Sequence, residues 1–368
     1  MSRLIDEIVE IKLSELAASA ASASVDTVAM LGVSDNSEAE VAVKFDLNSV
    51  SEAYDDGESM SNITRSARSF FTERMTPGKL VCIPVSDEPS VSTITDILDG
   101  ALAKGTDSDG NEIDFFHIYY QVPAEATAED IIALIIGDKD NVGIDDWCFL
   151  NDKIFHLEVL DKEVGYAVLD GLQKKLKNTA IYYYSETTGI SAAGAAIADR
   201  CGNDPARGTW ALKTFTSLTP NILTNTELKK ATDKGLNVYA SIAKVGCLIN
   251  GFCGSATNFI DSVVKKAWIK FRIQEVVFNT LRQSNSGYGV TYGDPGIIAI
   301  QAAIQDVFTL AADSEHQYVM PDSYEVIVPK FDNIPDEERK KRNLPFVKAT
   351  CQIQDFIHTV KTIQILVV

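Results

Sequence analysis

The chain has 368 residues, 45% of them hydrophobic and 23% charged, which is typical of a soluble globular protein with one large domain or two smaller ones. Its formal net charge is -19, and residues 1–150 hold 9 Lys and Arg against 29 Asp and Glu. Such a surface repels phosphate, so we expect no nucleic-acid partner. No apolar run approaches the roughly 20 residues of a membrane helix, and a signal-peptide layout is missing. These features predict no membrane partner and synthesis in the cytosol.

The N-terminal stretch has the pattern of a half-buried strand on a tether. Val9, Ile11 and Leu13 alternate with polar residues, which gives the period of two expected for a strand. The small side chains of Ala17–Ser24 cannot build a core and indicate a flexible or extended connector. Residues 1–25 are therefore predicted to form an arm, whose strand pairs either within its own chain or with a neighbouring copy.

Residues 26–200 alternate between strand and helix patterns. This order predicts an α/β domain with a mixed or largely parallel sheet. Because this half is acidic, we expect it to face outward in any assembly. The predicted strands are Thr27–Val33, Val41–Leu47, Lys79–Val85, Asp114–Gln121 and Thr179–Ser185, and the predicted helices are Met60–Arg74, Ser92–Ala103, Ala128–Ile136, Val164–Leu176 and Ile190–Arg200.

The alternation of strand and helix patterns ends at the turn-rich segment Cys201–Thr209, which we take as a domain boundary. Residues 201–343 are predicted to form an α+β domain. A strand near Asn237–Val245 is followed by Asn250-Gly251, the dipeptide typical of a two-residue hairpin turn. Apolar residues at helical spacing predict a long helix from Ile260 to Leu281.

Residues 344–368 are predicted to form two further strands that complete the sheet of this domain or act as a second arm. Ile363, Ile365 and Val367 lie on one side of the last strand, which continues to the end of the sequence. An unpaired apolar strand would template aggregation. It is therefore either the centre of a local sheet or a device that joins chains.

Motifs that carry chemistry are weak. The six cysteines and four histidines have no zinc-ligand spacing, and we expect all six thiols to be free. Gly287-x-Gly289 lacks the third glycine of a dinucleotide-binding turn and follows a helix. Cys253 lies in the predicted hairpin with no histidine nearby in sequence, which favours packing over nucleophilic catalysis. No catalytic residue, cofactor or metal site is predicted.

Four segments together resemble the contractile tail sheath proteins of phages. Cys201–Ile242, Asn250–Leu281 and Phe346–Val368 are similar, in this order, to the C-terminal region of that family. Phe70–Ser86 is similar to the helix, turn and strand of the family's middle domain. The resemblance covers the C-terminal half well and the remainder loosely.

The resemblance implies a structural subunit without a cofactor, assembled in the host cytoplasm and located in the virion tail. Such subunits stack as hexameric rings around an inner tube, contact baseplate and tail terminator proteins, and contract by rigid-body rearrangement. Their arms add strands to neighbouring subunits. If this sequence follows the family, the N-terminal and C-terminal strands described above would be the exchanged strands. The basic residues of the long helix could face an acidic tube or only solvent; they are Lys265, Lys266, Lys270 and Arg272.

Two other classes of protein fit parts of the sequence. A soluble α/β enzyme or ligand-binding protein of unknown substrate is compatible with the first half, although the missing motifs and the apolar termini disfavour it. A baseplate or tube component is a further alternative, which the α/β half disfavours. Trimming both arms should leave an enzyme as a defined small oligomer, whereas a sheath subunit should lose polymerisation with its domains still folded.

Overall fold

The computed structural model describes residues 24–85, 91–172, 176–185, 190–255, 257–283 and 289–358. Contacts within the chain define two compact units. The larger unit contains Val25–Val263 and the described residues from Asp355 onward, and the smaller unit contains Val264–Gln354. The expected boundary at residue 201 therefore lies inside the larger unit, because the chain that follows it adds strands to the same sheet.

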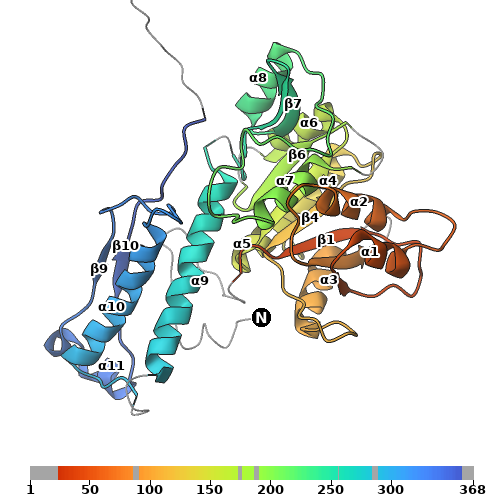
Figure 1. Ribbon diagram of the computed structural model, residues 1–368. Helices are drawn as coiled ribbons and strands as arrows, with labels where there is room; N and C mark the ends of the chain where they lie inside the picture. The colour runs from red at the N-terminus through yellow and green to blue at the C-terminus, as the bar shows by residue number, and fades with distance from the viewer. Residues whose placement is uncertain are drawn as a thin grey trace, which may run out of the picture. The chain divides into compact units, whose positions relative to one another are not determined.

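The larger unit is built on an eight-stranded sheet in the order β2-β3-β1-β4-β5-β6-β7-β8 (Figure 1). The six strands from β3 to β7 run parallel, and the edge strands β2 and β8 are antiparallel to their neighbours. The prediction of a mostly parallel α/β sheet is confirmed. The strands are β1 (Val28–Val33), β2 (Ala42–Lys44), β3 (Leu80–Val85), β4 (His117–Gln121), β5 (Ile154–Val159), β6 (Thr179–Tyr183), β7 (Asn237–Ile242) and β8 (Val245–Ile249).

Helices cover both faces of this sheet, as expected when parallel strands are joined by helical crossovers. On one face lie α1 (Leu47–Tyr54), α2 (Asn62–Phe71) and α7 (Ala192–Cys201). The other face packs against α3 (Val91–Lys104), α4 (Ala128–Ile136), α5 (Ile144–Leu150), α6 (Lys162–Leu172) and α8 (Asn225–Lys234).

Alternating side chains of the central strand β4 pack against the helical layers on the two faces of the sheet. Ile118 and Tyr120 join the apolar core beneath α3 to α6. Tyr119 points the opposite way and meets Phe70 of α2 edge-on, with ring centroids 5.4 Å apart. The strand is thus buried on both sides, which is why it reads as a continuous apolar run rather than an alternating one.

The hairpin of the larger unit turns at Ala243 and Lys244, so the prediction of a turn at Asn250-Gly251 is wrong. Ile249 pairs with Val238 of β7 and not with Phe252. Ala243 and Lys244 have φ values of 50° and 69°, the left-handed pair that a two-residue hairpin loop requires.

The smaller unit combines two long helices with a short antiparallel sheet. Helix α9 (Ile260–Gln283) begins in the larger unit and continues into this one. The second long helix, α10, begins with Pro295 in its first turn, where the missing N–H of proline costs no helical hydrogen bond. The elements that follow α9 are α10 (Asp294–Ala311), β9 (Glu325–Ile327), the 3-10 turn η2 (Phe331–Asn333), α11 (Asp336–Lys340) and β10 (Lys348–Thr350).

Candidate functional site

The short sheet of the smaller unit is the first candidate site. Strands β9 and β10 pair antiparallel, with Ala349 opposite Val326. The side chain of Val326 is buried, and its carbonyl accepts a hydrogen bond of 2.7 Å from Nε2 of Gln301 on α10. All three residues of β10 are exposed. Among the described residues each of the two strands has one strand partner, so each leaves an edge open.

The chain that follows β10 is held by hydrogen bonds to residues 318–320 and to α9. Met320 N donates to the carbonyl of Gln352, and Gln354 N donates to the carbonyl of Tyr318, both at 2.9 Å. Nζ of Lys265 on α9 then donates to the carbonyl of Gln354 at 2.6 Å. The segment after β10 is thereby fixed in an extended conformation against the connection that follows α10 and against α9.

Apolar side chains lie exposed beside this sheet. Phe346, just before β10, is 66% exposed and has a φ of 63°, an unusual backbone conformation for an aromatic residue. Ile327 of β9 is 46% exposed, and Val347 and Met320 are also exposed. An open edge flanked by apolar side chains is the geometry that accepts an added strand from another chain.

The predicted strand residues of both arms lie outside the described residues: Val9, Ile11, Leu13, Ile363, Ile365 and Val367. The four predicted cations of the long helix are described, and they do not form one basic face. At about 100° per residue, Lys265 and Arg272 share one side of α9, and Lys266 and Lys270 lie roughly 130° away. Lys265 and Lys270 are buried, whereas Lys266 is exposed.

Arg272 is partly exposed and is held within its own helix. Its guanidinium pairs with Glu275 at 2.6 Å and lies over the ring of Trp268. The expectation that the four cations give the helix a single basic side is therefore corrected. A cationic side chain can hide its stem and head in a protein when acceptors are present, as the carbonyl of Gln354 is for Lys265.

The last described residue anchors the end of the chain to the larger unit. Nε2 of His358 lies 2.8 Å from Oγ1 of Thr209, and the His358 ring meets Phe259 edge-on at 4.9 Å. These contacts fix the position of His358 on the larger unit. Sequence reasoning missed this anchor, because a lone histidine in a strand-like segment carries no signal of its partner.

A polar cluster is sealed inside the larger unit. Nδ1 of His117 lies 2.9 Å from Nε2 of His156, whose Nδ1 lies 3.2 Å from the Tyr182 hydroxyl, and the ring of His156 stacks on Trp210. Both histidines are 0% exposed. Burial lowers the pKa of His117 to about 3 and that of His156 well below its usual value. Neutral imidazoles without solvent access support packing rather than acid–base catalysis.

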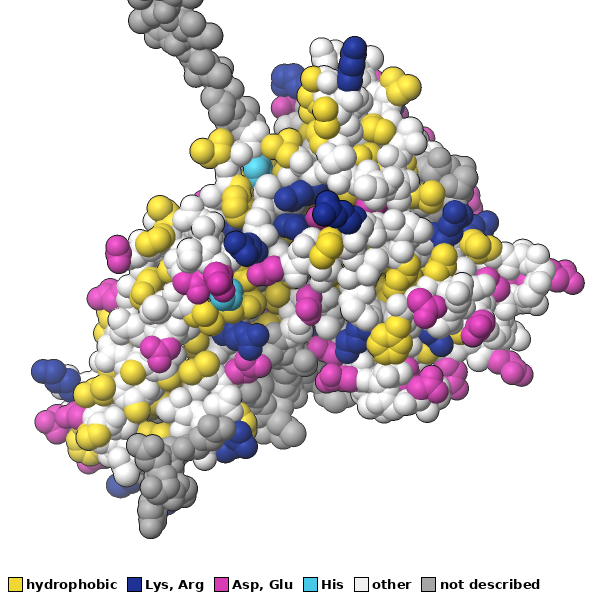
Figure 2. Space-filling model, viewed as in Figure 1, with side chains coloured by type: hydrophobic (Ala, Val, Ile, Leu, Met, Phe, Trp, Pro, Cys, Tyr) yellow, Lys and Arg dark blue, Asp and Glu magenta, His cyan; other side chains and the backbone are white. Residues whose placement is uncertain are grey.

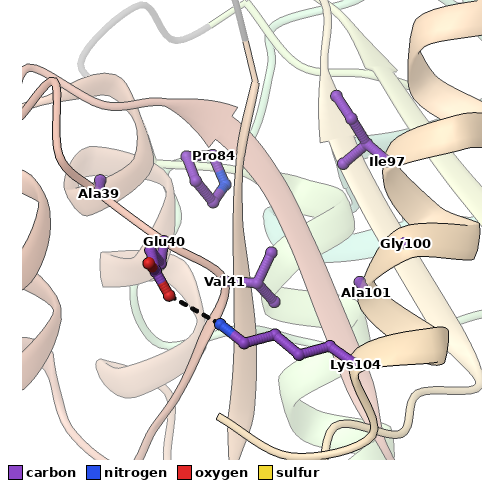
Figure 3. A pocket seen from close by; sticks show the side chains of 8 residues that line it. All are labelled: Ala39, Glu40, Val41, Pro84, Ile97, Gly100, Ala101 and Lys104. Atoms are coloured by element: carbon purple, nitrogen blue, oxygen red, sulfur yellow. Dashed lines mark hydrogen bonds and ion pairs between the residues drawn. The ribbon is translucent and has the colours of Figure 1, made fainter. Parts of the chain in front are cut away.

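A shallow hollow of about 560 Å³ lies between α3 and the segment that precedes β2, beside Pro84 of β3 (Figure 3). Nζ of Lys104 on α3 spans it to Oε2 of Glu40 at 2.8 Å. The remaining lining is small or aliphatic and includes Pro84, Ile97 and Val41. The only charged groups of the lining neutralise one another, so the hollow offers no nucleophile or acid–base pair.

The described part of the chain contains no group of three or more His, Cys, Asp or Glu residues arranged to hold a metal ion. Within the same ranges, no helix is long and apolar enough to span a membrane. Five of the six cysteines are buried, and Cys351 is partly exposed.

No protein-family model matches the chain, and no curated protein matches it. Solved structures do match over nearly its whole length. A chain of the anti-feeding prophage (AFP) baseplate, 6-fold symmetrised, is 12% identical with a TM-score of 0.59, covering 97% of this chain and 98% of that one. A chain of the PVC sheath complex in the contracted state, from an extracellular contractile injection system, is 12% identical with a TM-score of 0.61 at the same coverage.

A chain of the AFP baseplate in the contracted state is 10% identical, with a TM-score of 0.61 and 93% coverage of both chains. The chain thus has the fold of proteins found in contractile injection systems, and the resemblance inferred from its sequence is confirmed at the level of the fold.

Proposed function

We propose that this chain is the structural subunit of a contractile sheath. It polymerises as stacked hexameric rings around an inner tube, and contraction is a rigid-body rearrangement from a metastable extended state. The observation that carries the proposal is the shared fold, which extends over 97% of the chain and includes a sheath complex among the similar structures. Partners of the particle are further copies of the chain, the inner tail tube, and the baseplate and tail terminator proteins.

Strand exchange through the terminal arms links the copies. The open edge of the β9–β10 sheet and its exposed apolar side chains support this part of the proposal. Alternating residues of the N-terminal arm (Val9, Ile11, Leu13) or of the C-terminal arm (Ile363, Ile365, Val367) supply the side chains of an added strand. Backbone hydrogen bonds then provide affinity, and the apolar flank fixes the register.

Contact with the inner tube involves fewer cations than the sequence indicates. Lys265 and Lys270 are buried in the subunit, so the proposed tube contact from α9 falls to Lys266 and Arg272. The two side chains lie on different sides of α9, so only one of them at a time can face an acidic tube surface, in a contact that weakens with added salt.

Negative-stain electron microscopy of the purified chain, over a range of concentrations and salt, tests the proposal. Hollow striated tubes or stacked rings are the expected result, either alone or after addition of the cognate tube. Compact particles of one size under all these conditions, with the tube present, would refute a sheath role. Deleting residues 1–16 should abolish long assemblies and leave circular dichroism and cooperative melting nearly intact.

The sheet edge is tested by Phe346→Asp, with Ile298→Asp as a matched control. Phe346 is 66% exposed, and Ile298 on α10 of the same unit is 57% exposed, so each substitution should change the free energy of unfolding by less than about 0.5 kcal/mol. Only Phe346→Asp, like the pair Ile363→Lys and Ile365→Lys, is expected to shorten the assemblies. Equal polymer lengths for Phe346→Asp and wild type would exclude this edge.

A further inference from the structure

One surface of the larger unit carries two cations and one carboxylate. Arg200, in the last turn of α7, is 7% exposed; its Nε pairs with Asp199 at 3.1 Å, and its Nη1 donates to the carbonyl of Arg207 at 3.0 Å. Lys213 is partly buried nearby. Burial, followed by the charge of Arg200, lowers the pKa of Lys213 below its usual value, and the nearby charge of Asp199 opposes this only in part. Figure 2 shows Lys and Arg side chains gathered over the region where α7 lies in Figure 1.

The ammonium group of Lys213 lacks a counterion of its own. Among the described residues no acceptor lies within hydrogen-bonding distance of its Nζ, and Asp199 already pairs with Arg200. The backbone of Lys213 is fixed, since its carbonyl accepts from Leu248 N of β8 at 2.8 Å. A desolvated cation beside a like charge is costly for the isolated subunit. A carboxylate from outside the chain would remove that cost.

The preceding residue adds a second cost at the same place. Leu212 is 52% exposed and has a φ of 61°, a backbone conformation that leucine rarely adopts. Its N–H donates to the carbonyl of Leu248 at 2.7 Å, so the strain is imposed by the pairing with the β8 edge. An exposed apolar side chain next to a cation that is only partly compensated fits a protein surface better than a small ion.

The chain itself carries a complementary surface, which we call the acidic lobe. It comprises five of the seven exposed carboxylates between residues 34 and 60, a range in which Lys44 is the single basic residue: Asp35, Glu38, Glu52, Asp56 and Glu58. The other two are engaged within the subunit, Glu40 with Lys104 and Asp46 at the start of α1. The two loops of the lobe are tied together, because Asp35 N donates to the carbonyl of Tyr54 at 3.1 Å and Ser59 Oγ donates to Asp35 at 3.2 Å. Figure 2 shows Asp and Glu side chains spread over the end of the larger unit where α1 lies in Figure 1.

We propose that the acidic lobe of one copy docks on the Arg200–Lys213 surface of the next copy. Two different surfaces of one chain then meet, which is the heterologous contact that generates rings or helical stacks. A carboxylate of the lobe supplies the counterion that Lys213 lacks, and Leu212 packs at the rim of the contact. This inference rests on the proposed self-assembly, and it adds a charge-dependent contact between the larger units that is separate from the sheet edge of the smaller unit.

Sedimentation velocity of the full chain at several salt concentrations tests the contact by charge reversal. Lys213→Glu, and separately the pair Glu52→Lys and Glu58→Lys, should each raise the concentration needed for half assembly by about tenfold or more. All three reversals in one chain should bring this concentration back to within about threefold of wild type. The matched control is Lys139→Glu, a fully solvated cation of the same unit whose reversal should have no effect.

Lys213→Met separates this contact from a role in the subunit's own fold. Removing the desolvated charge should raise the melting temperature of the dissociated subunit. The same change should weaken assembly, so that the subunit becomes more stable while the polymer becomes less stable. A lower melting temperature with unchanged assembly would show that Lys213 serves only its own fold. If the wild-type chain assembles but the combined reversal does not restore assembly, this contact is refuted and the sheath proposal is unaffected. A wild-type chain that never assembles, even with the tube, would overturn the sheath proposal and this contact together.

Discussion

Replacing Glu158 by Gln should make the fold less sensitive to alkaline pH. Glu158 is fully buried on β5, where Oε1 accepts from Nε2 of Gln121 at 3.1 Å and Oε2 accepts from Ala193 N at 2.9 Å. Burial raises the pKa of Glu158 from 4.5 to about 7. A Gln side chain can keep both contacts, because its oxygen can accept from Ala193 N while its amide donates to the Gln121 oxygen.

The sign of the pH effect follows from proton uptake. Folded Glu158 holds a proton that the unfolded chain releases above about pH 4.5, so its contribution to stability is lost as pH rises toward 7 and is fully lost above that value. His117 acts in the opposite direction, since its lowered pKa makes the unfolded state bind more protons below about pH 6.5. Comparing the Glu158→Gln variant with wild type at each pH cancels the histidine contribution.

The difference between a pKa of 4.5 in the unfolded chain and about 7 in the folded one corresponds to roughly 3 kcal/mol, most of which appears between pH 5 and 8. Relative to wild type, the melting temperature of Glu158→Gln should therefore rise by about 5 to 10 °C over this range. Calorimetry at half-unit pH steps measures the difference. The control substitution Glu125→Gln, at an exposed carboxylate, should show no such rise in melting temperature with pH. Parallel melting curves for Glu158→Gln and wild type from pH 5 to 8 would refute the assignment of a buried, titrating carboxyl.

Glu73→Gln should lower the free energy of unfolding by about 2 kcal/mol, because its carboxylate accepts from the backbone N–H and the hydroxyl of both Thr216 and Ser217, and an amide can satisfy only half of these donors. Faster amide exchange at Thr216 and Ser217, absent in Glu125→Gln, would identify the cause. Lys244→Gly should raise the free energy of unfolding by about 1 kcal/mol, since glycine adopts the positive φ of the hairpin turn without strain. A denaturant midpoint that is unchanged or lower would contradict that reasoning.

Most of the sheet could be predicted, because its strands are buried on both faces and stand out as short apolar runs. Strand β5 was missed for a physical reason. His156 and Glu158 interrupt its apolar run, although both are buried beneath α7 and bonded to groups far away in sequence. The short helix α5 was also missed, since Asp145 and Asp146 make its first turn look solvated while Asp145 in fact accepts from the backbone of Lys177 and Asn178.

The candidate site was less predictable than the fold. Asn250-Gly251 has the stronger local turn signal, but Asn237 Oδ1 accepts from the N–H groups of Gly251 and Phe252 and holds them in the core. The hairpin then turns at Ala243 and Lys244 despite their unfavourable backbone angles. The burial of the α9 lysines could not be predicted for a related reason. The acceptor of Lys265 is the carbonyl of Gln354, which is 89 residues away in sequence. Long-range partners of this kind leave no mark in a local pattern.

Backbone strain accompanies each of the two proposed contacts between copies, although positive φ values also occur elsewhere among the described residues. Leu212 and Phe346 both have positive φ values, and both are exposed apolar residues. Leu212 adjoins the Arg200–Lys213 surface, and Phe346 adjoins the open edge of the small sheet. Strain costing about 1 kcal/mol or more per residue persists only where the surrounding structure enforces it, as the bonds from Leu212 and Lys213 to Leu248 do. A protein that functions as a monomer would gain stability from glycine or asparagine at these positions. Their absence is expected if the side chains are needed in the assembly, where the energy of the contact offsets the local strain.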